Sequence, residues 1–97
     1  MTYYSRKQVV EILQIDDVFL VALEQEDVIS VDAPEDTGGD FSEKMLERVR
    51  VADNLVHDLD INLPGAAVIV RMREEMAELR HRVESFLEAL ERREKGS

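Results

Sequence analysis

Hydrophobic residues are spaced most regularly in the last third of the chain, over residues 62–95. From residue 69 onward they recur at alternating steps of three and four, at Ile69, Met72, Met76, Leu79, Val83, Phe86 and Leu90. This a/d heptad pattern places all of them along one side of a helix, where they face a partner helix. Asn62 suits the N-cap and Pro64 the first turn. The pattern predicts one helix roughly 45–50 Å long.

The far half of such a helix is expected to project beyond a globular part of this size. Its apolar stripe, which we call the seam (the seven residues above), then needs a cover. The simplest cover is the same helix of a second copy, so the sequence predicts a homodimer with the seam as its interface. The alternative is that the helix folds back on its own domain.

Two short helices are predicted near the N-terminus. Ser5 is a suitable N-cap, and Gln8 follows at capping-box spacing. This helix should run to about Leu13 and bury Val9, Ile12 and Leu13. A second helix begins after Asp16 as N-cap and ends near Glu26. Two helices joined by so short a turn make a helix-turn-helix.

A wing and a third helix are predicted to follow. Residues 28–31 are rich in β-branched side chains and suggest a short strand. Residues 32–40 form a polar loop with proline and paired glycines, so the wing spans about residues 28–40. A third helix should open at Ser42 and end about Asp58, and its expected buried stripe is Met45, Val49, Ala52, Val56 and Leu59. The predicted fold is mainly α, one domain, with a winged helix-turn-helix over residues 1–60 and a dimerisation helix over residues 61–95.

Composition narrows the class of protein. The 97 residues are 44% hydrophobic, which is typical of one small globular domain. We find no apolar run long enough for a membrane span and no signal-peptide pattern, and we expect a cytoplasmic protein. There is no cysteine, and His57 and His81 stand alone. We therefore expect no metal site, no cofactor and no enzymatic activity, since no catalytic motif is present.

The net charge of −10 is unevenly distributed. Residues 1–40 carry two basic and ten acidic side chains, whereas residues 41–97 carry ten basic and twelve acidic ones. The negative field is therefore concentrated on the N-terminal segment. Such a field repels a phosphate backbone and attracts a basic partner.

Several short motifs resemble the MerR superfamily of winged helix-turn-helix proteins, and within it the CbpM-type chaperone modulators. They are residues 4–6 (Tyr-Ser-Arg), residues 19–24 (Phe-Leu-x-x-Leu-Glu) followed by the Val-Ile pair at 28–29, the Phe-Ser pair at 41–42, and residues 60–66 (Asp-Ile-Asn-Leu-Pro-Gly-Ala). The resemblance spans roughly residues 4–90. It departs from the usual pattern at Asp60 and at Gln14, where glycine is common.

MerR-type regulators read DNA with the second helix and the wing. Here residues 16–27 and 32–40 contain no lysine or arginine, although contacts to guanine and phosphate require them. The resemblance to CbpM implies another use, because that family binds the basic J-domain of a DnaJ-like co-chaperone, CbpA, and blocks its stimulation of DnaK. The candidate partner-binding residues are Asp16, Asp17, Val21, Glu24, Glu26 and Asp27. The alternative is a MerR- or HspR-like transcription regulator, whose DNA contacts would come from Arg6, Lys7, Lys44, Arg48 and Arg50.

Overall fold

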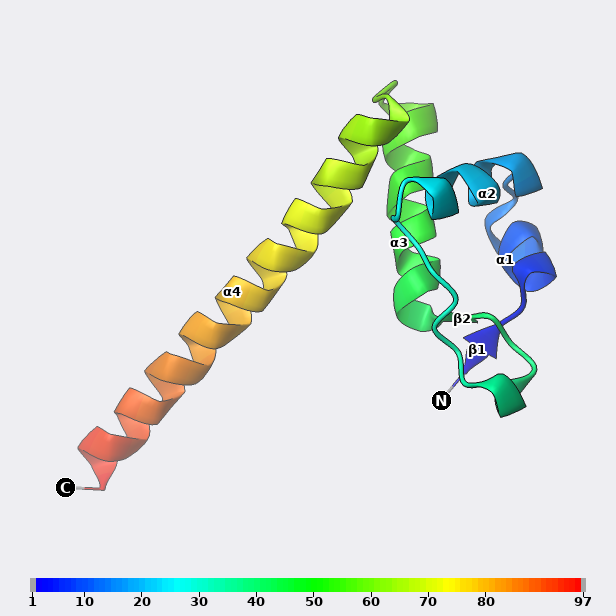
Figure 1. Cartoon of the computed structure of the whole chain (residues 1–97). Helices are drawn as coiled ribbons and strands as arrows, with labels where there is room; N and C mark the ends of the chain where they lie inside the picture. The colour runs from blue at the N-terminus through cyan, green and yellow to red at the C-terminus, as the bar shows by residue number, and fades with distance from the viewer. Residues whose placement is uncertain (1, 97) are drawn as a thin grey trace.

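The computed structural model describes residues 2–96, which fold into a small head and one long helix (Figure 1). The elements in order are β1 (Tyr3–Tyr4), α1 (Arg6–Leu13), α2 (Asp17–Gln25), the 3₁₀ turn η1 (Glu35–Thr37), β2 (Phe41–Ser42), α3 (Glu43–Asp53), the π-helical segment η2 (Asn54–Asp58) and α4 (Leu63–Lys95). We call residues 2–62 the head. The predicted mainly α fold, a winged helix-turn-helix with a long C-terminal helix, is confirmed.

The helices begin where polar side chains satisfy their first free backbone N–H groups. Ser5 forms a complete capping box with Gln8, and the side chains of Ser42 and Asn62 cap α3 and α4. These three predicted caps are confirmed. Asp16 occupies the N-cap position of α2, but its side chain makes no capping hydrogen bond. Each side-chain cap stabilises a helix by about 1 kcal/mol.

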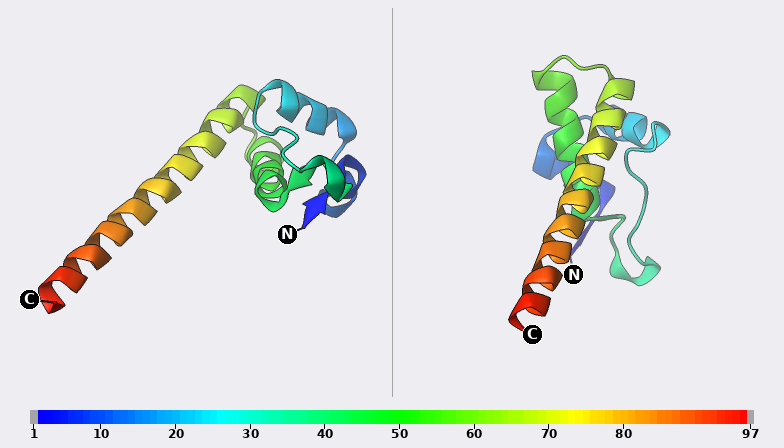
Figure 2. Two further views of the ribbon diagram at one scale, coloured as in Figure 1. Left: turned by 60° about the horizontal axis from the view of Figure 1, so that its bottom comes forward. Right: turned by 90° about the vertical axis from the view of Figure 1, so that its left-hand side faces the viewer.

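The core of the head is formed by α1, α2, α3 and the first turns of α4. Its largest fully buried side chains are Phe41, Leu20, Leu23, Val9 and Val49. Helix α4 adds Ala66 and Val70 to the buried residues, and it leaves the head after Glu74, which pairs with Arg48 of α3. The head therefore fixes where α4 starts and in which direction it points, as Figure 2 shows from two further sides.

The predicted strand at residues 28–31 is wrong. The only sheet among residues 2–96 is the antiparallel pair β1–β2, in which Tyr3 lies opposite Ser42 and Tyr4 opposite Phe41. Val28 and Ile29 are both buried, although they are neighbours in sequence. A strand would send adjacent side chains to opposite faces, so this burial is typical of irregular backbone pinned to the core.

Two residues predicted to be buried are exposed. Ile12 of α1 is 54% exposed, and Leu59 at the end of the third helix is 64% exposed. The reason at Leu59 is the change from α to π geometry over Asn54–Asp58, where Leu59 N–H donates to the carbonyl of Asn54, five residues back. A wider turn shifts the following side chains out of the phase of the buried stripe.

Helix α4 projects from the head as predicted. It has 33 residues, and every residue from Glu75 to Gly96 is exposed. The radius of gyration is 17.4 Å, whereas a compact chain of this length has about 12–13 Å. Although α4 is long, neither it nor another helix among residues 2–96 is apolar enough to span a membrane.

Three connections in the head turn through left-handed backbone without glycine. Gln14 after α1, Asp27 after α2 and Asp60 after η2 have φ values of 53°, 57° and 54°. The first and last are the two positions at which the resemblance described above leads us to expect glycine. A residue with a Cβ is strained in this region, although aspartate tolerates it better than most.

Replacing Asp60 by glycine is therefore expected to stabilise the protein by about 0.5 kcal/mol, because it relieves the left-handed strain. Urea unfolding followed by circular dichroism measures the change. The matched control is Asp58→Gly, which removes the same side chain inside η2 and should destabilise. Equal effects of the two variants would show that the backbone at Asp60 is not strained.

Candidate protein-interaction site

The second helix of the helix-turn-helix, α2, turns a largely uncharged side to solvent. Its inner side buries Leu20 and Leu23. On the opposite side Val18 is 79% and Val21 40% exposed. We define the α2 face by the residues on this outer side: Asp17, Val18, Val21, Ala22 and Gln25. Only one of the five is acidic, so the outer side of α2 is less charged than its sequence suggests.

Glu24 is turned away from the α2 face by an ion pair within the head. Its carboxylate lies 2.5 Å from Arg6 Nη2, and a second guanidinium nitrogen, Nη1, lies 3.9 Å from Asp17. The guanidinium carbon of Arg6 is 5.8 Å from the centroid of the Phe41 ring. Arg6 thus joins α1 to α2 over the core, and part of the charge of Glu24 is neutralised internally.

The remaining acidic candidates stand at the two ends of α2. Asp16 and Asp17 precede or begin the helix, and Glu26 and Asp27 follow it; all four are exposed. At 1.5 Å per residue the two acidic ends are about 15 Å apart. The predicted site residues are therefore brought onto one helix, but as an apolar centre with acidic ends. Gln25 was not among the predicted residues, although its spacing from Val18 and Val21 places it on the same side.

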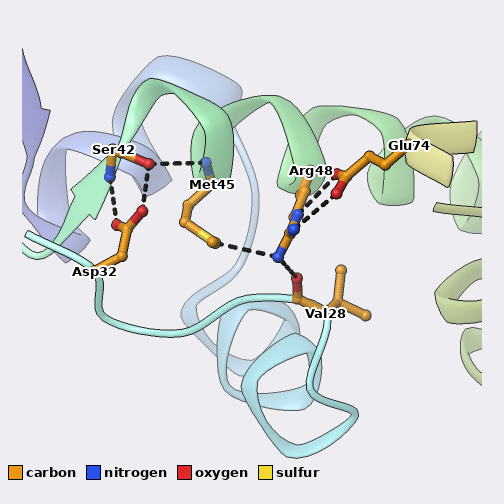
Figure 3. Close-up of polar contacts among 6 residues, drawn as sticks. All are labelled: Val28, Asp32, Ser42, Met45, Arg48 and Glu74. Atoms are coloured by element: carbon orange, nitrogen blue, oxygen red, sulfur yellow. Dashed lines mark hydrogen bonds and ion pairs between the residues drawn. The ribbon is translucent and has the colours of Figure 1, made fainter. Parts of the chain in front are cut away.

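The loop after α2 is held in place by two of its acids, Asp32 and Asp40, of which Figure 3 shows Asp32. Asp32 accepts hydrogen bonds from the backbone N–H of Ser42 at 2.7 Å and from its hydroxyl at 2.5 Å. Asp40 accepts one from the backbone N–H of Arg6 at 3.1 Å. These bonds tie both ends of the loop to β2 and α1. Glu35 and Asp36, in the turn between them, remain exposed.

Arg48 of α3 connects the end of α2 to α4 (Figure 3). Its guanidinium forms a two-pronged pair with Glu74 of α4, with Nε 2.8 Å and Nη2 2.7 Å from the carboxylate oxygens. Nη1 donates to the Val28 carbonyl at 3.3 Å. The hydrogen bonds between Arg48 and Glu74 lower the pKa of the Glu74 carboxyl group and raise the pKa of the Arg48 guanidinium.

Most of the cations proposed for DNA contact are engaged within the molecule. Arg6 pairs with Glu24, Arg48 with Glu74, and Arg50 with Glu47 at 2.6 Å. Lys7 and Lys44 are the other two members of that set, and both are exposed. An arginine that must first leave a carboxylate makes a weaker contact to phosphate, because the carboxylate competes for the same donors.

The seam of α4 faces away from the head. At 3.6 residues per turn, its mean direction lies roughly 130° around the helix from Ala66 and Val70, which are buried in the core. All seven seam residues are exposed, from 36% at Ile69 to 63% at Phe86. The head of the same chain therefore leaves the seam uncovered, contrary to the alternative in which α4 folds back.

The arrangement of α1, α2, the following loop and α3 is that of a winged helix-turn-helix protein. Residues 4–88 match the sequence profile of the family described as MerR HTH family regulatory protein. The chain belongs to this family, which confirms the resemblance at the level of the superfamily. No curated protein and no solved structure matches it.

The Arg48–Glu74 pair should make stability depend on acid pH. Because the folded-state pKa of Glu74 is lowered, its contribution is present above the unfolded pKa near 4.5 and is lost as pH falls through the folded value. Glu74→Gln should destabilise the protein by about 1 kcal/mol at neutral pH, since the pair is partly exposed. It should also flatten the fall in stability below pH 4.5.

Thermal unfolding measured from pH 7 to pH 3 tests this expectation. The control is Glu78→Gln, because Glu78 pairs with Arg82 on the exposed part of α4 and not with the head. If both variants lose stability below pH 4.5 as steeply as the original protein does, the Arg48–Glu74 pair does not stabilise the contact between the head and α4.

Proposed function

We propose that this protein is a non-enzymatic adaptor that uses the helix-turn-helix scaffold to bind a basic protein surface in place of DNA. The partner we infer is the J-domain of a DnaJ- or CbpA-like co-chaperone, which the adaptor would keep from stimulating DnaK. The observation that carries the proposal is the absence of lysine and arginine from Gln8 to Glu43, which includes all of α2 and the loop after it.

Charge supports a protein partner over a nucleic acid. Residues 1–62 contain five basic and fifteen acidic side chains, so the head carries the whole net charge of −10. Affinity for DNA depends largely on cations that displace the counterions of phosphates. An acidic surface instead accelerates association with a basic one and rejects other polyanions. J-domains present a basic helix to DnaK, and the motif at residues 60–66 resembles that of modulators that bind them.

A DNA-binding transcription regulator is the second candidate, because the match to a family of regulatory proteins is equally compatible with it. In that case the contacts would come from Lys7 and Lys44, with arginines released from their carboxylates. The two candidates differ in the sign of the ligand's charge, which makes them separable by a single binding experiment.

The proposed adaptor acts as a homodimer joined through the seam. Residues 63–97 contain seven basic and seven acidic side chains, so two such helices can approach without net repulsion. An exposed stripe of Ile, Met, Leu, Val and Phe of this length is costly to leave in water. Heptad spacing suits a second helix as its cover.

Binding to a purified J-domain and to duplex DNA tests the proposed function. We expect the J-domain to bind at about 50 mM salt and more weakly at about 500 mM, because screening reduces attraction between exposed charges. Fluorescence anisotropy with each labelled ligand provides the measurement. Tight DNA binding that weakens steeply with salt, without J-domain binding, would establish the transcription regulator instead.

Leu79→Lys should convert the proposed dimer to a monomer, because it places a charge at the centre of the seam. Size-exclusion chromatography with light scattering reports the mass. Ser85→Lys is the matched control, since it adds the same charge on the opposite side of α4 and should leave the dimer intact. A Leu79→Lys protein that stays dimeric would place the interface elsewhere.

A further inference from the structure

We propose that the α2 face is the docking surface itself, and that its partner is a basic amphipathic helix that buries apolar side chains on Val18 and Val21. This inference rests on the proposed function and specifies how the partner is held. Its cations would lie toward the two acidic ends of α2, Asp16–Asp17 and Glu26–Asp27.

The centre of the α2 face is suited to contact rather than to solvation. Val18, Val21 and Ala22 recur at helical spacing on the side of α2 opposite Leu20 and Leu23. Val18 is 79% exposed, and no element among residues 2–96 covers it. Their small side chains leave a shallow surface, so the larger apolar side chains must come from the partner. Burial at the centre of an interface, with charges around it, is the arrangement in which contacts contribute most to affinity.

The acidic ends of α2 determine which apolar helix can dock. Two exposed carboxylates at each end, about 15 Å apart, match a helix of some three turns that carries lysine or arginine near both ends of its apolar stripe. A second copy of this chain does not fit, because its head is equally acidic and its own amphipathic helix, α4, carries no net positive charge. A DNA groove does not fit either, since α2 offers phosphates only carboxylates and neutral groups.

Glu24 has a different role from the other acidic candidates. Its ion pair with Arg6 holds α2 against α1, and its side chain is only 27% exposed. We therefore place it under the α2 face as a positioning residue, outside the contact with the partner. This assignment separates it experimentally from Asp16 and Asp27.

The kinetics of binding to a J-domain distinguish these roles. The double variant V18S/V21S should raise the dissociation rate about tenfold and leave the association rate unchanged, because it removes apolar contact without altering charge. D16N/D27N should lower the association rate about threefold or more at low salt and change dissociation little. Val31→Ser, an equally conservative change at a 59% exposed valine outside α2, serves as the control.

E24Q should leave both rate constants near the original values while lowering the unfolding temperature. If V18S/V21S binds the J-domain with unchanged dissociation, the docking mode is wrong although the proposed function stands.

A second probe keeps the inference independent of the J-domain. A synthetic lysine–leucine amphipathic helical peptide, titrated into the full chain, should shift the NMR methyl signals of Val18, Val21 and Ala22 more than those of Val31 and Val68. Loss of the Ala22 shift in V18S/V21S, which keeps that methyl group, supports the docking surface even if the J-domain fails to bind. Absence of methyl shifts at α2 with both ligands overturns it.

Discussion

The guanidinium of Arg48 connects α3, on which it lies, to the segment after α2 and to α4, and the arrangement of the head and the long helix depends on these contacts. It lies on α3 and reaches the carbonyl that follows α2 on one side and the carboxylate of Glu74 on the other. Because the guanidinium is planar, it satisfies both directions at once, which lysine could not do. Arg48, whose side chain is 22% exposed, therefore helps to hold both the direction in which α4 leaves the head and the position of the segment after α2, alongside the burial of Ala66 and Val70.

The head and α4 differ in net charge as well as in shape. The head carries the entire net charge of −10, and α4 is neutral although two residues in five are charged. Within the head, Arg6 and the loop acids Asp32 and Asp40 use part of that charge for internal contacts. Among the acids of α2 and the loop after it, those that remain exposed lie at the ends of α2 and at the turn of the loop. A scaffold that usually presents cations to DNA thus offers an apolar helix side bordered by carboxylates.

Local rules predicted much of this fold. The caps at Ser5, Ser42 and Asn62 and the heptad spacing of α4 depend on residues at most a turn or two apart, and all were recognisable in the sequence. The sheet was not, because two-residue strands pair Tyr3–Tyr4 with Phe41–Ser42 across almost forty residues and leave no periodic signal. The exposure of Leu59 was missed because a π-helical segment has no sequence signature in the α-helical period.

The candidate site was also only partly predictable from the sequence. The lack of lysine and arginine in α2 was evident from the sequence. The ion pair that turns Glu24 away from the α2 face was not, because its partner, Arg6, lies 18 positions earlier and only the fold brings it near. A helical projection of α2 around Leu20 and Leu23 would have indicated Gln25 as part of its outer side. Whether a given carboxylate remains free depends on the tertiary fold, because the fold decides which basic side chain or backbone N–H group lies next to it.

The isolation of the last six turns of α4 has a consequence for amide hydrogen exchange. Residues 75–96 are all exposed and none belongs to the core of the head, and a helix of this length alone in water frays readily. In a single chain the exchange protection should therefore decline along α4 toward its end, independently of the stability of the head. A second helix laid along the seam would extend strong protection to Leu90, so the exchange profile of α4 directly reports association between chains.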